Sequence, residues 1–250
     1  MQHKFSRTEL IIGAQGLEKL ANSKVVVFGV GGVGSYTIEA LVRAGIGELV
    51  MVDYDEICLT NVNRQLHALH STVGKTKVEV MKERALDINP GLKVSAVKEF
   101  YTSEAADKFL TPDVTYVVDA IDTVKSKISL VLECKRRDIP IICSMGAGNK
   151  LNPTAFKVAD ISETRICPLA KAMRKLLRKQ GIERGVKVVY SAETPLTPNL
   201  AEFDCKVNCI CPNKNGHCTK KRQIPGSISF VPSVVGLIIA GEVVNDILQA

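Results

Sequence analysis

The sequence predicts an α/β fold built on one doubly wound, mostly parallel sheet with helices on both faces. Short runs rich in β-branched residues alternate with amphipathic helical stretches five times between residues 24 and 144, as expected for a parallel sheet whose strands are buried on both faces. A glycine-rich turn follows the first of these runs, and an aspartate ends the second. The apolar fraction of 46% and the charged fraction of 24% are typical of a globular protein.

The first strand, helix and second strand form a predicted nucleotide-binding unit. Residues 25–28 read as a buried strand, residues 33–44 as the helix, and the second strand ends at Asp53. The turn between strand and helix has the spacing G-x-G-x-x-G, with one additional glycine: Gly29, Gly31, Gly32 and Gly34. Such glycines allow a tight turn and a close approach of backbone to phosphate at the helix N-terminus. An acid 19 residues after the last glycine is placed to bind a ribose hydroxyl.

Hydrophobic periodicity and turn residues assign the remaining elements. Residues 1–20 form a helical arm, and the helix at 74–89 is stopped by Pro90 and Gly91. The later elements are strand 92–97, helix 103–110, strand 114–119, helix 125–137, strand 140–144, strand 154–159, helix 168–180, strand 186–190, strand 227–231 and a final buried helix. We expect one domain over 1–250, with a nucleotide-binding half (1–150) and a substrate and dimer half (151–250). A mobile, cysteine-containing crossover loop (193–226) extends the second half.

Polar residues follow successive strands at the sheet edge where open α/β sheets bind ligands. The segment after Asp53 supplies Asp55, Asn61, Arg64 and Gln65, and the helix at 74–89 opens with Lys75 and Lys77. The fourth strand ends in Asp119-Ala-Ile-Asp122. Arginine, lysine and amide groups can stabilise charge on phosphates, and an aspartate can hold a phosphate-bound Mg²⁺. Each residue also has an ordinary structural interpretation, but together they predict a site for a nucleoside triphosphate.

These motifs resemble those of the ThiF/MoeB superfamily of adenylating enzymes, which is related to the ubiquitin-activating enzymes. The resemblance covers nearly the whole chain through Arg7, Gly29–Gly34, Asp53–Gln65, Gly74–Lys77 and Asp119–Asp122. It implies that Asp53 binds the ribose of ATP, with Asp55 and Gln65 in the same motif, and that Asp122 holds Mg²⁺. It further implies that the triphosphate is held by Asn61, Arg64 and Lys77, and that Arg7 reaches the site from the other subunit of a homodimer. Family members activate a carboxylate as an acyl adenylate.

Within the superfamily, the sequence is most similar to the tRNA threonylcarbamoyladenosine dehydratases. The stretches that carry this resemblance are residues 60–69, 118–122, 146–154 and 160–170. It implies an ATP-dependent enzyme that adenylates the carboxylate of threonylcarbamoyladenosine in tRNA and cyclises the side chain. The alternative is an adenylyltransferase acting on the C-terminal glycine of a ubiquitin-like sulfur carrier, which would share the nucleotide site. A non-catalytic nucleotide or RNA binder and an NAD-dependent dehydrogenase are less consistent with the phosphate-binding residues.

The net charge of +7 predicts a polyanionic partner. Much of the excess lies in residues 171–187, where Lys171, Arg174, Lys175 and Arg178 share one helical face. A solvated surface helix is the plain interpretation, and contact with tRNA, rather than DNA, is the functional one. A sulfur-transfer protein is a further candidate partner.

The eight cysteines and the N-terminus indicate a cytoplasmic protein. The first twenty residues carry charges and lack a signal peptide's apolar stretch, so disulfides are not expected. Residues 223–241 are uncharged, and we interpret them as a strand and buried helix, with membrane association as the alternative. Cys167 is either a reactive thiol, as in the sulfur-transfer branch of the superfamily, or an ordinary loop thiol. A zinc site is one interpretation of Cys205, Cys209, Cys211 and Cys218, although their spacing is not a standard zinc pattern. An iron–sulfur cluster and a redox-labile or disordered loop are the alternatives.

Overall fold

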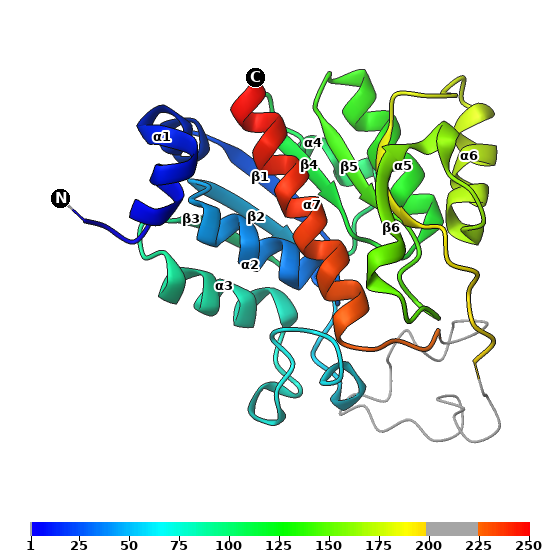
Figure 1. Cartoon of the computed structure of the whole chain (residues 1–250), viewed down its shortest axis with the longest axis horizontal. Coiled ribbons are helices and arrows are strands. Elements are labelled where there is room, and N and C mark those ends of the chain that lie inside the picture. The colour runs from blue at the N-terminus through cyan, green and yellow to red at the C-terminus, as the bar shows by residue number, and fades with distance from the viewer. Residues whose placement is uncertain (1, 199–224) are drawn as a thin grey trace.

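The computed structural model describes residues 2–198 and 225–250, and within them the predicted fold class is confirmed. Seven strands form one sheet in the order β3-β2-β1-β4-β5-β7-β6 (Figure 1). All neighbouring strands pair in parallel except β6, which is antiparallel to β7 at the sheet edge. The strands are β1 (Lys24–Phe28), β2 (Glu48–Val52), β3 (Lys93–Val97), β4 (Tyr116–Asp119), β5 (Ile141–Ser144), β6 (Phe156–Asp160) and β7 (Lys187–Ser191).

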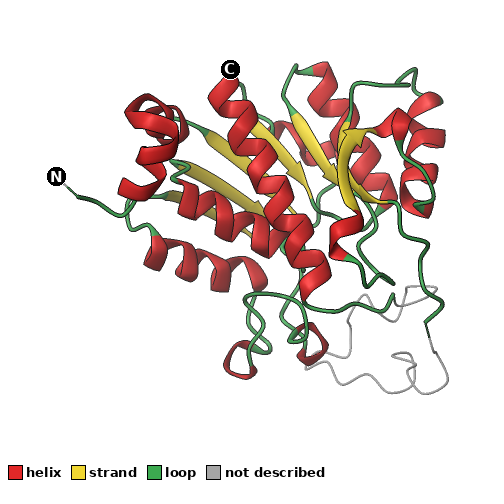
Figure 2. Cartoon of the chain, in the orientation of Figure 1, coloured by secondary structure: helices red, strands yellow, loops and turns green. Residues whose placement is uncertain are grey.

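Helices cover both faces of this sheet (Figure 2). They are α1 (Ser6–Ala21), α2 (Gly34–Ala44), α3 (Lys77–Ile88), α4 (Ala106–Phe109), α5 (Val124–Arg136), α6 (Pro168–Arg178) and α7 (Phe230–Gln249). Side chains of α1, α2, α3 and α7 share one hydrophobic core. Side chains of α4, α5 and α6 share the other. This two-sided burial explains why the central strands have near-continuous apolar sequences instead of alternating ones.

Several sequence-based boundaries differ from the structure. The helix expected at 74–89 begins at Lys77, and the helix expected at 103–110 is a 3₁₀ turn followed by the four-residue α4. The strand expected at 227–231 is wrong, since helix α7 already begins at Phe230. Pro232 lies in its first turn, where a missing N–H leaves no hydrogen bond unmade.

Helix α7 is long and apolar enough to cross a membrane, and it is the one such helix in the described part of the chain. Half of the apolar stretch of α7 is buried inside the protein, and the helix lies along α2 (Figure 1). The two helices can approach closely because Gly236 has no side chain. A Cβ at this position would overlap the carbonyl oxygen of Val33. Thr37 Oγ1 also donates a hydrogen bond to Gly236 O at 3.1 Å. The contacts of α7 are therefore those of a helix in the protein core.

The predicted crossover loop falls mostly outside the described residues. Residues 199–224 contain Cys205, Cys209, Cys211 and Cys218, so the zinc hypothesis concerns a part of the chain that the structure does not describe.

Candidate nucleotide-binding site

The glycine turn lies where the order of strands reverses, between β1 and β4. Gly29 has φ +89°, and a Cβ on it would lie 2.6 Å from the carbonyl oxygen of Ala120. A Cβ on Gly34 would overlap the carbonyl oxygen of Gly29. Both positions thus require glycine, which brings β1, α2 and the end of β4 together. This is the crevice in which doubly wound folds bind ligands.

Asp53 connects the glycine turn to the segment that follows β2. Its Oδ2 accepts a hydrogen bond from Val30 N at 2.7 Å, and its Oδ1 accepts one from Asp55 N at 2.8 Å. The side chain is 9% exposed. Burial raises the pKa of Asp53, although the positive charge of Lys77 acts in the opposite direction. The sequence-based placement of this carboxylate beside the glycine turn agrees with the structure.

Lys77 is the first residue of α3 and points back to the two aspartates. Its side chain is 6% exposed, and its Nζ lies 2.7 Å from Asp55 Oδ2 and 3.9 Å from Asp53 Oδ1. The carboxylate of Asp55 is 40% exposed, so the pair opens toward solvent. A buried ammonium at a solvent-facing opening is suited to a phosphate, with Asp55 as its partner in the structure described.

The segment from Asn61 to Gln65 contacts the glycine turn through its backbone and one side chain. A Cβ on Gly32 would lie 3.4 Å from Arg64 O, and a Cβ on Gly31 would lie 3.9 Å from Gln65 Nε2. Gln65 Oε1 is buried, with no hydrogen-bond partner among the described residues. Asn61 Oδ1 accepts a hydrogen bond from Cys58 N. Asn61 thus stabilises the turn at residues 58–61.

The guanidinium of Arg64 is held by local contacts. Its Nη1 donates to Thr60 O and to Asn63 Oδ1, both at 2.9 Å, and burial lowers the pKa of Arg64. The charge remains positive because an arginine titrates far above neutral pH. The guanidinium therefore lies against residues 58–63, whereas the backbone of Arg64 is the part that meets the glycine turn.

The C-terminal segment supports the same turn. A Cβ on Gly32 would lie 3.1 Å from Pro232 in the first turn of α7, and Asn63 Nδ2 donates to Ser227 O at 2.9 Å. The glycine turn and the segment after β2 therefore pack against α7 and the residues just before it.

Asp122 is exposed in the turn that follows β4. Burial raises the pKa of the neighbouring Tyr54, and the charges of Asp55, Asp122 and Asp53 raise it further. All three carboxylates are therefore near one phenol, at the same edge of the sheet. Their oxygens suit Mg²⁺, which commonly uses one or two carboxylates together with phosphate oxygens. No group of three or more metal-binding side chains occurs within residues 2–198 and 225–250.

A buried ion pair supports the turn that carries Asp122. Asp119 and Lys127 are both fully buried, with Oδ2 and Nζ 2.8 Å apart. Asp119 Oδ1 accepts a hydrogen bond from Ile121 N, and Lys127 Nζ donates to Ile121 O. Sequence analysis missed Lys127. Its helical spacing with Leu130 and Cys134, both buried in α5, was the available signal.

Sequence analysis also missed His67. The side chain is 2% exposed, and neither ring nitrogen has a hydrogen-bond partner among the residues described. Burial, reinforced by the charge of Lys77, lowers the pKa of His67 to about 3. The imidazole is thus neutral at physiological pH and lies close enough to Lys77 to feel its charge.

Arg7 is not brought to the site within this chain. It is exposed near the start of α1, and the ring of neighbouring Phe5 lies against Gly45, the C-terminal cap of α2. The glycine turn is at the opposite end of α2. Figure 1 likewise shows α1 far from the loop that follows β2.

Cys167, a further candidate, is 1% exposed and is the N-cap residue of α6.

A family model described as the ThiF family matches residues 5–250. This chain belongs to the ThiF family. It is 51% identical to the tRNA threonylcarbamoyladenosine dehydratase of Bacillus subtilis, covering 100% of this chain and 96% of the relative. It is 35% identical to the Haemophilus influenzae enzyme of the same name, covering 99% of this chain and 94% of that one.

Solved structures of this ThiF-family branch share the fold. The Escherichia coli tRNA N6-threonylcarbamoyladenosine dehydratase in complex with ATP has a TM-score of 0.84 and 32% identity, with 98% of this chain and 94% of that chain covered. The AMP complex of the same enzyme has a TM-score of 0.86. By contrast, the E. coli sulfur carrier protein ThiS adenylyltransferase is 30% identical over only 58% of this chain. The resemblance found from the motifs is confirmed.

Proposed function

We propose that this protein is an ATP-dependent tRNA threonylcarbamoyladenosine dehydratase. The observation that carries the proposal is the convergence of the glycine turn, Asp53, Lys77 and Asp122 at the strand-order reversal. Full-length relatives with this name, and ATP and AMP complexes of one of them, support it. The sulfur-carrier alternative is less well supported, since its named relatives match little more than half of the chain.

The proposed reaction has two steps. A carboxylate oxygen of the threonylcarbamoyl group attacks the α-phosphorus of ATP; the new C–O–P bond forms as the bond to the β-phosphate breaks, and pyrophosphate leaves. The carbamoyl group then forms a bond to the activated carbonyl carbon of the same side chain as the bond from that carbon to the AMP oxygen breaks. AMP leaves, an N–H of the carbamoyl group gives up its proton, and one water is lost overall. Because the second step is intramolecular, it needs no nucleophile from the enzyme.

The chain's own residues supply binding and charge stabilisation. In this proposal Asp53 would bind the ribose, and the backbone of Gly29–Gly34 would bind the phosphates. Lys77 and Arg64 would stabilise the charge that develops on phosphorus. Asp122 would hold Mg²⁺, which supplies Lewis-acid stabilisation of the phosphate oxygens when bound. Asn61 stabilises the turn at residues 58–61 through its bond from Cys58 N, and Gln65 packs beside Gly31.

A homodimer with Arg7 acting across subunits is part of the proposal. Leu10 and Ile11, one turn after Arg7 on α1, are 87% and 85% exposed. Adjacent exposed apolar side chains of this size commonly mark a protein contact. A second copy covering them would bring its own α1, and thus an arginine, toward this chain. We also propose a single adenylation domain with halves 1–150 and 151–250, and a cytoplasmic location.

The test is a single reaction with ATP, Mg²⁺ and tRNA bearing threonylcarbamoyladenosine. Digested nucleosides should contain the product that is one water lighter. The variant Asp122→Ala should lose both this product and ATP–pyrophosphate exchange. Asp113→Ala is the matched control because the side chain of Asp113 is 64% exposed, lies outside the site and pairs with Lys24. Adenylation of a carrier protein without any change in tRNA would refute the proposal.

A further inference from the structure

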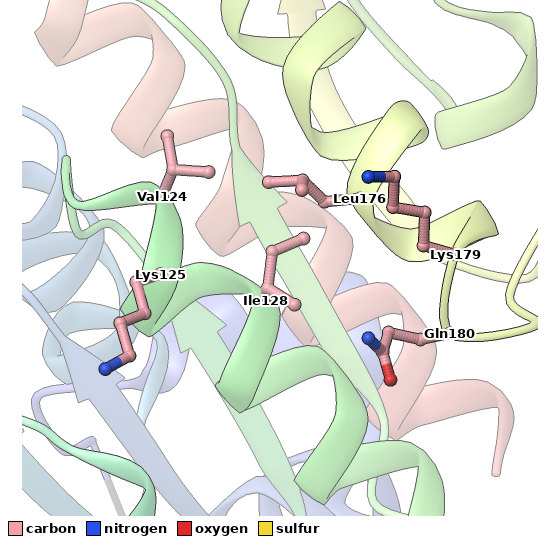
Figure 3. Close-up of a pocket in the computed structure, with 6 residues that line it drawn as sticks. All are labelled: Val124, Lys125, Ile128, Leu176, Lys179 and Gln180. Atoms are coloured by element: carbon pink, nitrogen blue, oxygen red, sulfur yellow. The ribbon is translucent and has the colours of Figure 1, made fainter.

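A groove between two helices lies next to the turn that carries Asp122. It has a volume of about 420 Å³ and is lined by the first turns of α5 and the end of α6: Val124, Lys125, Ile128, Leu176, Lys179 and Gln180 (Figure 3). This volume falls in the range of roughly 300–1,000 Å³ for small-molecule sites. The first residue that lines the groove, Val124, comes two residues after Asp122, so an occupant would lie near that carboxylate.

The lining combines an aliphatic floor with two flanking cations. Val124, Ile128 and Leu176 form the floor, and Leu176 is 37% exposed. Lys125 and Lys179 lie on the two sides, both exposed (Figure 3). Neither lysine has an ion-pair partner within 4 Å among the described residues. Lys125 also contributes in small part to lowering the pKa of Glu104, which is lowered mainly by a hydrogen bond from Thr102.

We propose that this groove binds a nucleotide of the substrate RNA that flanks the modified adenosine. The aliphatic floor would contact the face of an unstacked base, and Lys125 and Lys179 would contact the phosphates on either side. Sequence-specific proteins commonly recognise RNA in such single-stranded loops, through unstacked bases and phosphate contacts. The inference rests on the proposed function and assigns its substrate a subsite.

Charge and continuity favour RNA over a peptide as the occupant. The basic surface of α6 continues from the groove through exposed Lys175 and Lys171. Arg174, on the same helix, is instead held by Thr164 O at 2.8 Å. A path of lysines that leads to the proposed Mg²⁺ residue matches a polyanion whose reacting base must reach that residue.

The experiment measures the affinity for an anticodon stem–loop carrying threonylcarbamoyladenosine, as a function of KCl, by fluorescence anisotropy. Lys125→Gln with Lys179→Gln should weaken RNA binding about 10-fold and reduce the salt slope by about 1.4, since each lost contact to single-stranded phosphate removes about 0.7. Leu176→Asn should weaken binding without changing the slope. The affinity for ATP should stay unchanged in both.

Matched controls lie away from the groove. Lys82→Gln with Lys93→Gln removes the same charge from α3 and β3, and Leu237→Asn removes a 50% exposed leucine from α7. Equal losses in the controls, or wild-type RNA affinity and slope in the groove variants, would overturn the subsite while leaving the dehydratase function intact. If the wild-type protein does not convert the tRNA at all, the proposed function fails, and the subsite fails with it.

Discussion

At the scale of single residues, the site depends on buried charges that are paired with each other. Asp53 accepts two backbone hydrogen bonds and lies near Lys77, and Asp119 is paired with Lys127. Removing one partner of a buried pair leaves an uncompensated charge, which costs more than the pair contributes.

Lys127→Met should therefore destabilise the protein by about 3–5 kcal/mol. The charge of Asp119 would then be buried without its cation. Urea unfolding measures the change. Adding Asp119→Asn to Lys127→Met should restore part of the loss, and exposed Lys125→Met should change the free energy of unfolding by less than about 0.5 kcal/mol. Equal stability of Lys127→Met and the wild type would contradict the ion-pair assignment.

His67 predicts a pH dependence of stability. Its pKa is about 3 in the folded protein against about 6.5 when unfolded. Above pH 6.5 both states are neutral at this residue, and no dependence arises. As the pH falls from 6.5 toward 3, only the unfolded state binds the proton, so the free energy of unfolding decreases by up to about 1.4 kcal/mol per pH unit.

His67→Leu should remove this part of the acid destabilisation, as measured by urea unfolding across pH 4–7. The exposed His70→Gln is the control and should keep the wild-type pH profile. A His67→Leu profile parallel to that of the wild type would show that the imidazole already titrates normally in the folded state.

Residue-level sequence analysis succeeded where topology determines position. The carboxyl ends of parallel strands share one edge, so Asp53 and Asp122 could be placed from strand ends alone. It failed for Lys127 and His67, because their burial follows from tertiary packing. The helical spacing of Lys127 with Leu130 and Cys134 indicates a shared face, but it does not show that a lysine on that face is buried beside Asp119.

At the scale of elements, the position of α2, and with it the glycine turn, depends on its close contact with α7. Gly236 allows this contact, as the crossing point has no room for a side chain. The sequence-based interpretation placed a strand at 227–231 ahead of the buried helix. The helix forms instead because its apolar residues complete the core over α2 and β1, which local alternation does not encode.

Gly236→Val should displace α7, lower the melting temperature and weaken ATP binding, since the adjacent helix carries the glycine turn. Calorimetry and ATP titration measure the two effects. Gly241→Ala on the same helix is the control, because nothing lies within 4 Å of its added Cβ. It should stabilise the protein by up to about 1 kcal/mol through helix propensity. Normal ATP binding by Gly236→Val would contradict the coupling.

At the scale of the whole molecule, Arg7, Leu10 and Ile11 are exposed, and the proposed homodimer would give them a role. Mixing Arg7→Ala subunits with Asp122→Ala subunits tests this. Each mixed dimer would contain one site with both residues intact, so a random mixture should recover about a quarter of wild-type activity. Each variant alone should be inactive, and an inactive mixture of exchanged subunits would show that Arg7 does not act across the interface.

The support that Pro232 and Ser227 give to the glycine turn has a consequence for synthesis on the ribosome. The glycine turn is synthesised well before helix α7, which packs against it. A nascent polypeptide that lacks α7 would have little affinity for nucleotide. ATP should therefore bind after α7 has docked and should not assist the earlier folding steps.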